Sequence, residues 1–267
     1  MVSRLRAYRA LLVAQIRGQA QYRASFVMEM VGQSTYTFMD FAAVLVLFRV
    51  TPAMGGFGLW QVLLISGLAI CGFSAADLAV GNVEQLRQYV RTGLLDAMLI
   101  RPRRVLPQLL AIDFQLRRVG RVVFAVVLVA VACAHVGVDW TWWRVLLVVG
   151  TPIAAAVFYA GIFVLTASVA FWWIDSGEFA NSFTYGGREF ATYPITIYGS
   201  VFRRVFAFGI GFAFISYYPA LAIMDTPDPL GMPAWFGALG PAAAAVMTAI
   251  AALVWRTGLR HYEGTGS

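Results

Sequence analysis

Long apolar runs without a single charge are the feature that most constrains this chain. A helix needs about 20 apolar residues to cross the hydrocarbon of a bilayer. With 60% hydrophobic and 12% charged residues and a mean hydropathy of +0.74, the 267-residue chain is too apolar for a soluble domain. The uncharged runs, and one run interrupted only by Asp40, are Met30–Phe48, Val50–Ala76, Val122–Val138, Val145–Ile174, Val205–Met224 and Pro229–Trp255.

Pro and Gly residues shorten two of these runs. Thr51-Pro52 and the Gly pair that follows break the second run, so we expect its helix at Gly58–Val80. Several Pro and Gly residues between Pro229 and Pro241 break the last run. We expect its continuous helix at Ala242–Trp255, preceded by short re-entrant or interfacial helices. The fold class that follows is an all-α integral membrane protein, one domain over residues 1–267 with six transmembrane helices.

The basic residues give the orientation. All 20 are Arg, the net charge is +7, and the Arg residues flank the apolar runs instead of forming a stripe on a polar domain, which argues against nucleic acid and for membrane lipid as a partner. With six spans, all but two of them fall on one side, and only Arg49 and Arg144 fall on the other. The segment 173–204 belongs to the Arg-rich side in this scheme. The positive-inside rule then predicts that this side and both chain ends are cytoplasmic.

Two amphipathic segments are expected outside the spans. In residues 3–23, apolar residues recur at helical spacing among Arg and Gln, which predicts an interfacial helix in the headgroup region. In residues 82–102, Asn82 is placed to cap a helix that ends at Arg101-Pro102. Its apolar face and its basic face suit a cytoplasmic helix that docks a soluble partner, although a helix that only lines the membrane has the same pattern. The residues expected to take part in docking are Leu86, Arg87, Tyr89, Val90, Arg91, Gly93, Leu94 and Asp96.

A few polar and helix-breaking residues lie at membrane depth. Asp40 shares a helix face with Gln33 and Thr37, and such a stripe avoids lipid, either to line a solute path or to form a structural hydrogen-bond network. Asp77 lies near the cytoplasmic end of its span, where we expect it to reach water. The helix breaks at Tyr193-Pro194 and Tyr217-Tyr218-Pro219 are further candidates for a path, although ordinary kinks have the same pattern.

Residues for chemistry are scarce. The chain has no Gly-x-x-x-x-Gly-Lys-[Ser/Thr] phosphate loop, and its two His residues, His135 and His261, lie far apart. Cys71 and Cys133 both fall in apolar runs and give neither a disulfide framework nor metal spacing. No catalytic set and no metal site is therefore expected.

The segment Arg91–Pro102 resembles the Gly-x-Leu-Asp-x-x-Leu-x-Arg-Pro motif of type-2 ABC exporter permeases, in particular the six-span group described as drug- or viologen-exporter-like. Tyr193-Pro194, Tyr217–Ala220 and the ending Leu259–Ser267 are similar to later motifs of that group. The resemblance covers about residues 3–267. It implies a multidrug-type exporter permease of the bacterial inner membrane, with 82–102 as the coupling helix. It also implies two copies of a separate ATPase that binds ATP and Mg²⁺, and a second permease, identical or related.

On this interpretation the chain is not an enzyme but provides the path for a hydrophobic or amphiphilic solute. Two alternatives stay open from the residues alone. An ion-coupled secondary transporter would use Asp40 for coupling, and a membrane-embedded enzyme of lipid metabolism would need clustered carboxylates or His at the cytoplasmic face.

Overall fold

The computed structural model describes residues 23–102, 104–112 and 118–262. The interfacial helix expected at residues 3–23 therefore lies outside the described residues, apart from Arg23. Within the described ranges the chain is helical and contains no strand. The elements in chain order are α2 (Arg23–Val50), α3 (Leu59–Val80), η1 (Gly81–Gln85), α4 (Leu86–Arg91), α5 (Leu94–Leu99), α6 (Val105–Ile112), α7 (Val119–Val136), α8 (Trp142–Ser168), η3 (Val169–Phe171), α9 (Gly177–Thr192), η4 (Ile195–Ile197), α10 (Ser200–Arg203), η5 (Arg204–Ile210, a π-helix), η6 (Phe212–Ile215), α11 (Tyr217–Met224), η7 (Ala234–Ala238) and α12 (Gly240–His261).

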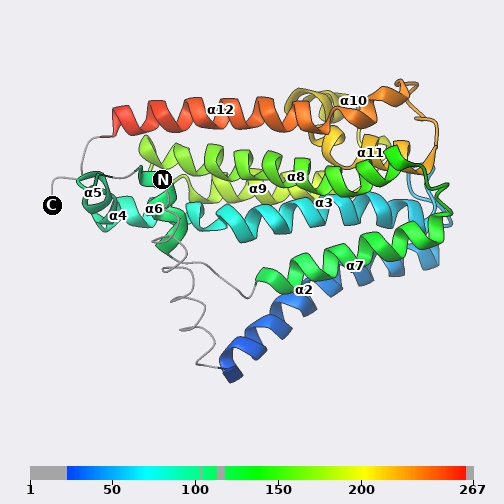
Figure 1. Cartoon of the computed structure of the whole chain (residues 1–267), viewed down its shortest axis with the longest axis horizontal. Coiled ribbons are helices and arrows are strands. Elements are labelled where there is room, and N and C mark those ends of the chain that lie inside the picture. Colours follow the sequence, from blue (N-terminus) through cyan, green and yellow to red (C-terminus); the bar gives the residue numbers. More distant parts are fainter. Residues whose placement is uncertain (1–22, 103, 113–117, 263–267) are drawn as a thin grey trace.

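The long helices run side by side between two ends of one bundle (Figure 1). α3 packs against α7, α8 and α9, while α12 packs against α8. One end carries α4, α5, α6 and the last turn of α12, and we call it the Arg-rich end. The other, which we call the α11 end, carries the loops that follow α2, α7 and α11.

Four helical segments in the described residues are long and apolar enough to cross a membrane, and they begin at Leu59, Val119, Trp142 and Gly240. They match four of the expected spans to within a few residues at most ends. The helix expected at Gly58–Val80 is confirmed as α3. α2 also covers the expected run Met30–Phe48, and its apolar part from Phe41 to Val50 is shorter.

Small residues let the central helices approach closely. A Cβ added at Gly72 of α3 would lie 3.0 Å from the main-chain carbonyl carbon of Ala155 in α8. A Cβ at Gly161 of α8 would lie 3.2 Å from the main chain of Met247 in α12. Close packing of this kind is how helices associate where lipid removes the hydrophobic driving force. Small residues at these two contacts thus allow α8 to pack closely against both α3 and α12.

The prediction of one membrane-spanning helix at Val205–Met224 is wrong. This stretch contains η5 except for its first residue, the short helix η6 and α11, and it turns back inside the bundle. Gly211 has a left-handed backbone (φ 103°) that ends η5. Phe212 then lies against Phe158 of α8 at a ring separation of 5.3 Å, and it is fully buried. Residues 200–224 therefore form a hairpin that enters the bundle from the α11 end and returns to it.

The helix that runs between the two ends at this point in the chain is α9. Its first residue, Gly177, lies under the Arg87 side chain at the Arg-rich end, and its last residue, Thr192, accepts a hydrogen bond from Ser66 Oγ of α3 (2.8 Å). Beyond it, Thr196 donates to the carbonyl of Gly55 at the α11 end (2.8 Å). Arg203 and Arg204 consequently lie at the α11 end, not at the Arg-rich end as the sequence suggested. Short re-entrant or interfacial helices were expected between Pro229 and Pro241, where the structure has the 3-10 helix η7 before α12 begins at Gly240.

Candidate functional site

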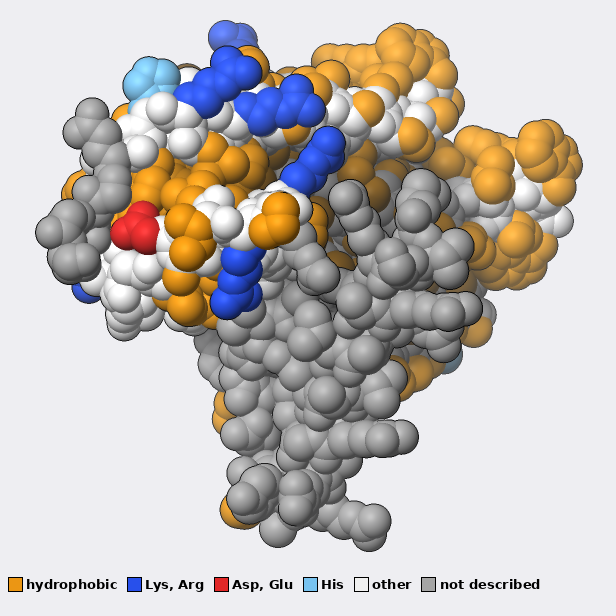
Figure 2. Space-filling model, turned by 60° about the vertical axis from the view of Figure 1, so that its left-hand side comes forward, with side chains coloured by type: hydrophobic (Ala, Val, Ile, Leu, Met, Phe, Trp, Pro, Cys, Tyr) orange, Lys and Arg blue, Asp and Glu red, His pale blue; other side chains and the backbone are white. Residues whose placement is uncertain are grey.

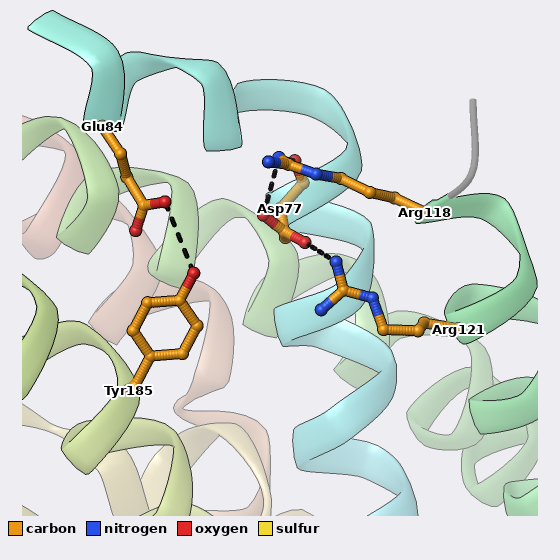
Figure 3. A network of polar contacts seen from close by, with 5 residues as sticks. All are labelled: Asp77, Glu84, Arg118, Arg121 and Tyr185. Atoms are coloured by element: carbon orange, nitrogen blue, oxygen red, sulfur yellow. Dashed lines mark hydrogen bonds and ion pairs between the residues drawn. The ribbon is translucent and has the colours of Figure 1, made fainter. Parts of the chain in front are cut away.

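A buried carboxylate organises the Arg-rich end (Figure 3). Asp77, in the last turn of α3, is 1% exposed, which corrects the expectation that it reaches water. Arg118 Nη1 lies 2.7 Å from Asp77 Oδ1 and donates to the Asp77 carbonyl at 2.6 Å, while Arg121 pairs with Oδ2. A Cβ at Gly81 would lie 1.9 Å from Arg118 Nη1, so only glycine leaves room for this pair. The triad fastens the end of α3 to the start of α7.

Glu84 extends the polar region towards α9. The Tyr185 hydroxyl of α9 donates to Glu84 Oε2 at 3.4 Å (Figure 3). Glu84 and Tyr185 also line a pocket of about 220 Å³ between η1, the end of α8 and the start of α9. Arg87 closes one side of this pocket, with its guanidinium directly over Gly177. Polar groups from the segment after α3 thus contact the first turns of α9 at the Arg-rich end.

The segment expected as one docking helix over 82–102 is divided. Asn82 does not cap it, because its amide donates to the Leu109 carbonyl of α6 (2.8 Å). α4 ends at Arg91, and Gly93 adopts a left-handed backbone (φ 69°) before α5 begins. A β-branched residue disfavours this backbone, so the turn depends on glycine.

The apolar face of this segment is used inside the chain. Leu86 and Val90 are buried in the core of the protein, and Tyr89 is half-buried against it. They are therefore not offered to a partner, contrary to the face that the periodicity indicated. Three large apolar side chains on the same segment are exposed instead, namely Leu94, Leu99 and Ile100. Figure 2, which brings this end forward, shows apolar side chains among Arg side chains with little acidic surface.

Two contacts tie the segment to the rest of the chain. Arg91 pairs with Asp175, just before α9, and both side chains are largely exposed. Asp96 lies close to Tyr262 after α12, and burial together with this carboxylate raises the pKa of Tyr262 to about 12. Tyr262 also packs against Phe171 at the end of η3. The docking residues predicted from sequence, from Leu86 to Asp96, are thus brought together, but they divide into an inward and an outward set.

The residues expected along a solute path do not gather in one place. Gln33, Thr37 and Asp40 belong to α2, and their side chains lie outside the described part of the structure. Tyr217, Tyr218 and Pro219 are buried inside this chain, where Tyr217 donates to Asp228 Oδ1 at 2.8 Å. Tyr193-Pro194 follows the end of α9, with Pro194 buried and Tyr193 half-buried.

One set of polar residues was missed by the sequence reasoning. Glu178, Ser182, Tyr185 and Glu189 are all exposed on α9, and their spacing of four, three and four residues places them on one helical face. We call this face the polar stripe. Arg188 pairs with Glu189 at 2.9 Å and lies over the ring of Phe73 at 5.5 Å, so α9 is polar well inside an apolar bundle. The spacing is visible in the sequence, but assigning 173–204 to a loop concealed it.

The family model described as ABC-2 family transporter protein matches residues 35–266. The chain belongs to this family. No curated protein and no solved structure was found to match it.

Membership in the ABC-2 family accounts for the absence of nucleotide chemistry in the sequence. Permeases of this family are in general the non-enzymatic membrane component of a transporter, and they work with an ABC ATPase. The ABC-2 chain described here is accordingly a membrane-integral permease. Its resemblance to type-2 ABC permeases, which the motif at Arg91–Pro102 indicated, is thereby confirmed.

Proposed function

We propose that this chain is the membrane-spanning subunit of an ABC exporter and forms the path for a hydrophobic or amphiphilic solute. Two copies of a separate ATPase bind ATP and Mg²⁺, and a second permease, identical or related, completes the pair. The chain crosses a bacterial-type inner membrane six times, through α2, α3, α7, α8, α9 and α12. Both termini are cytoplasmic, and the Arg-rich end faces the cytoplasm.

The polar stripe of α9 is the observation that supports a path most strongly. Ionisable residues at membrane depth are costly in lipid, and they face a bundle interior, a partner or a water-filled cavity. In this chain Glu178, Ser182 and Glu189 are exposed, so nothing in the described residues covers them. We propose that a second permease or water lies against this face. A solute path between two permeases would place both the second permease and water against this face.

The outward residues of the 82–102 segment support ATPase docking. Leu94 and Ile100 are exposed on the same segment as Arg91, at the end of the molecule that we propose faces the cytoplasm. Apolar anchors with a basic rim are typical of a surface that binds another protein. On this proposal Leu94, Leu99 and Ile100 enter the ATPase, while Arg87, Tyr89, Gly93 and Asp96 hold the segment in shape.

Cysteine labelling tests the path. Gly186 borders the polar stripe, is exposed and has no heavy atom within 4 Å of an added Cβ, so we expect a Gly186→Cys variant to fold. Ile250→Cys on the exposed side of α12 is the matched control. The two positions lie at a similar depth, because Thr184 meets Thr166 of α8 at 3.0 Å and Gly161 of α8 meets Met247 of α12. Cys71 and Cys133, both buried, are first replaced by Ala.

In membranes that also contain the ATPase, the Gly186→Cys protein should react with a water-soluble thiol reagent or cross-link to a second copy. The Ile250→Cys protein should do neither, because a thiol needs water to form the reactive thiolate. If Gly186→Cys is as inert as Ile250→Cys and forms no cross-link, the stripe lies in lipid and the proposed path is wrong.

A further inference from the structure

A second hollow lies at the α11 end, away from the polar stripe and from the docking segment. It has a volume of about 530 Å³, within the range of small-molecule sites, and it is open to the surface. Arg203 and Arg204 line one side, and Phe208, Met232 and Phe236 line much of the rest. The hollow thus combines two cations with an apolar floor.

Among the residues that the structure describes, neither Arg203 nor Arg204 makes an ion pair, whereas Arg144 at the same end pairs with Asp225 at 2.9 Å. The nearby Asp228 already accepts hydrogen bonds from Tyr217 Oη and from the Met232 N–H. Arg204 is exposed and Arg203 is half-buried, so both guanidinium groups can donate to one anion, which would also relieve their mutual repulsion.

The backbone brings both cations to the same hollow. α10 ends at Arg203, and the π-helix η5 begins at Arg204. π-helical turns are rare and are frequent at functional sites. Consecutive residues of an α-helix point about 100° apart, yet here both side chains line one cavity.

Apolar side chains continue the surface next to the two cations. Val201 is 73% exposed, and Phe202 and Val205 on the same short helices are 44% and 50% exposed. An acidic group with an apolar tail, bound in the hollow, would cover these side chains. Free phosphate would leave them uncovered.

We propose that this hollow binds the headgroup of an anionic phospholipid from the non-cytoplasmic leaflet. The Arg203 and Arg204 guanidinium groups hold the phosphate through charge-assisted hydrogen bonds, and the acyl chains lie along Val201, Phe202 and Val205. The site depends on the orientation of the chain in the membrane but not on the ATPase or on the transported solute.

Lipid titration of the purified chain in detergent tests this site. Bound phosphatidylglycerol and phosphatidylcholine are counted by native mass spectrometry. The wild-type chain should prefer phosphatidylglycerol, and the double variant Arg203→Gln/Arg204→Gln should bind it about tenfold more weakly or worse. The matched control is Arg49→Gln, which removes an exposed cation from the same end outside the hollow and should leave binding unchanged.

A second arm separates lipid from soluble phosphate. Glycerol phosphate, the headgroup without acyl chains, should compete with phosphatidylglycerol only at far higher concentration. Competition as strong as that of the whole lipid would mean a soluble anion and would overturn the lipid assignment. Unchanged binding in the Arg203→Gln/Arg204→Gln protein, or an equal loss in Arg49→Gln, would also overturn it. The double variant Arg203→Lys/Arg204→Lys keeps both charges and should retain most of the preference for phosphatidylglycerol. Retention in the Lys protein would attribute the loss in the Gln protein to the missing charges.

Discussion

At the scale of single residues, the Asp77 carboxylate lies between two guanidinium groups and is shielded from water. Breaking a buried pair by removing one member leaves charge without compensation, which destabilises a protein by about 3 kcal/mol or more. Asp77→Asn should therefore lower the unfolding free energy by about that amount, measured by denaturant titration in detergent. Asp175→Asn is the control, because its pair with Arg91 is exposed and should contribute at most about 1 kcal/mol. Equal losses from the two substitutions would show that the Asp77 triad is not structural.

At the scale of elements, we expect opposite effects from substitutions on the outward and inward sides of the docking segment. Leu94→Asp and Ile100→Asp should abolish co-purification with the ATPase but leave thermal stability close to that of the wild type, because both side chains are exposed. Leu86→Asp should instead unfold or greatly destabilise the chain, since it places a carboxylate in the core. If the double variant Leu94→Asp/Ile100→Asp binds the ATPase normally, this segment is not the docking element.

Sequence reasoning found the elements that depend on local pattern. The apolar runs predicted α3, α7, α8 and α12, because length and hydropathy suffice for a helix that crosses a bilayer. It missed α9, whose Glu178, Arg188 and Glu189 look like a polar loop until neighbouring helices are in place. The prediction that Leu86 faces a partner was wrong for a similar reason. Periodicity identifies an apolar face of a helix but not the surface that covers that face.

At the scale of the whole molecule, α9 and the hairpin at 200–224 decide the path of the chain through the membrane. Ser200 lies at the α11 end, whereas a span at Val205–Met224 would have left it in the cytoplasm. In intact cells, Ser200→Cys should react with a membrane-impermeant thiol reagent. Gln88→Cys, exposed at the Arg-rich end, should react only after the membrane is opened. If Ser200→Cys, like Gln88→Cys, reacts only after the membrane is opened, the span at Val205–Met224 is restored.

We propose that a separate ATPase drives transport along a path lined by α9. The most direct measurement is the rate at which the Gly186→Cys protein, in membranes with its ATPase, reacts with a water-soluble thiol reagent, compared without nucleotide and with ATP bound to a hydrolysis-deficient ATPase. If ATP binding rearranges the two permeases about the polar stripe, the two rates should differ, while the rate at Ile250→Cys stays constant. Equal rates at Gly186→Cys in a complex that demonstrably contains the ATPase would contradict the account.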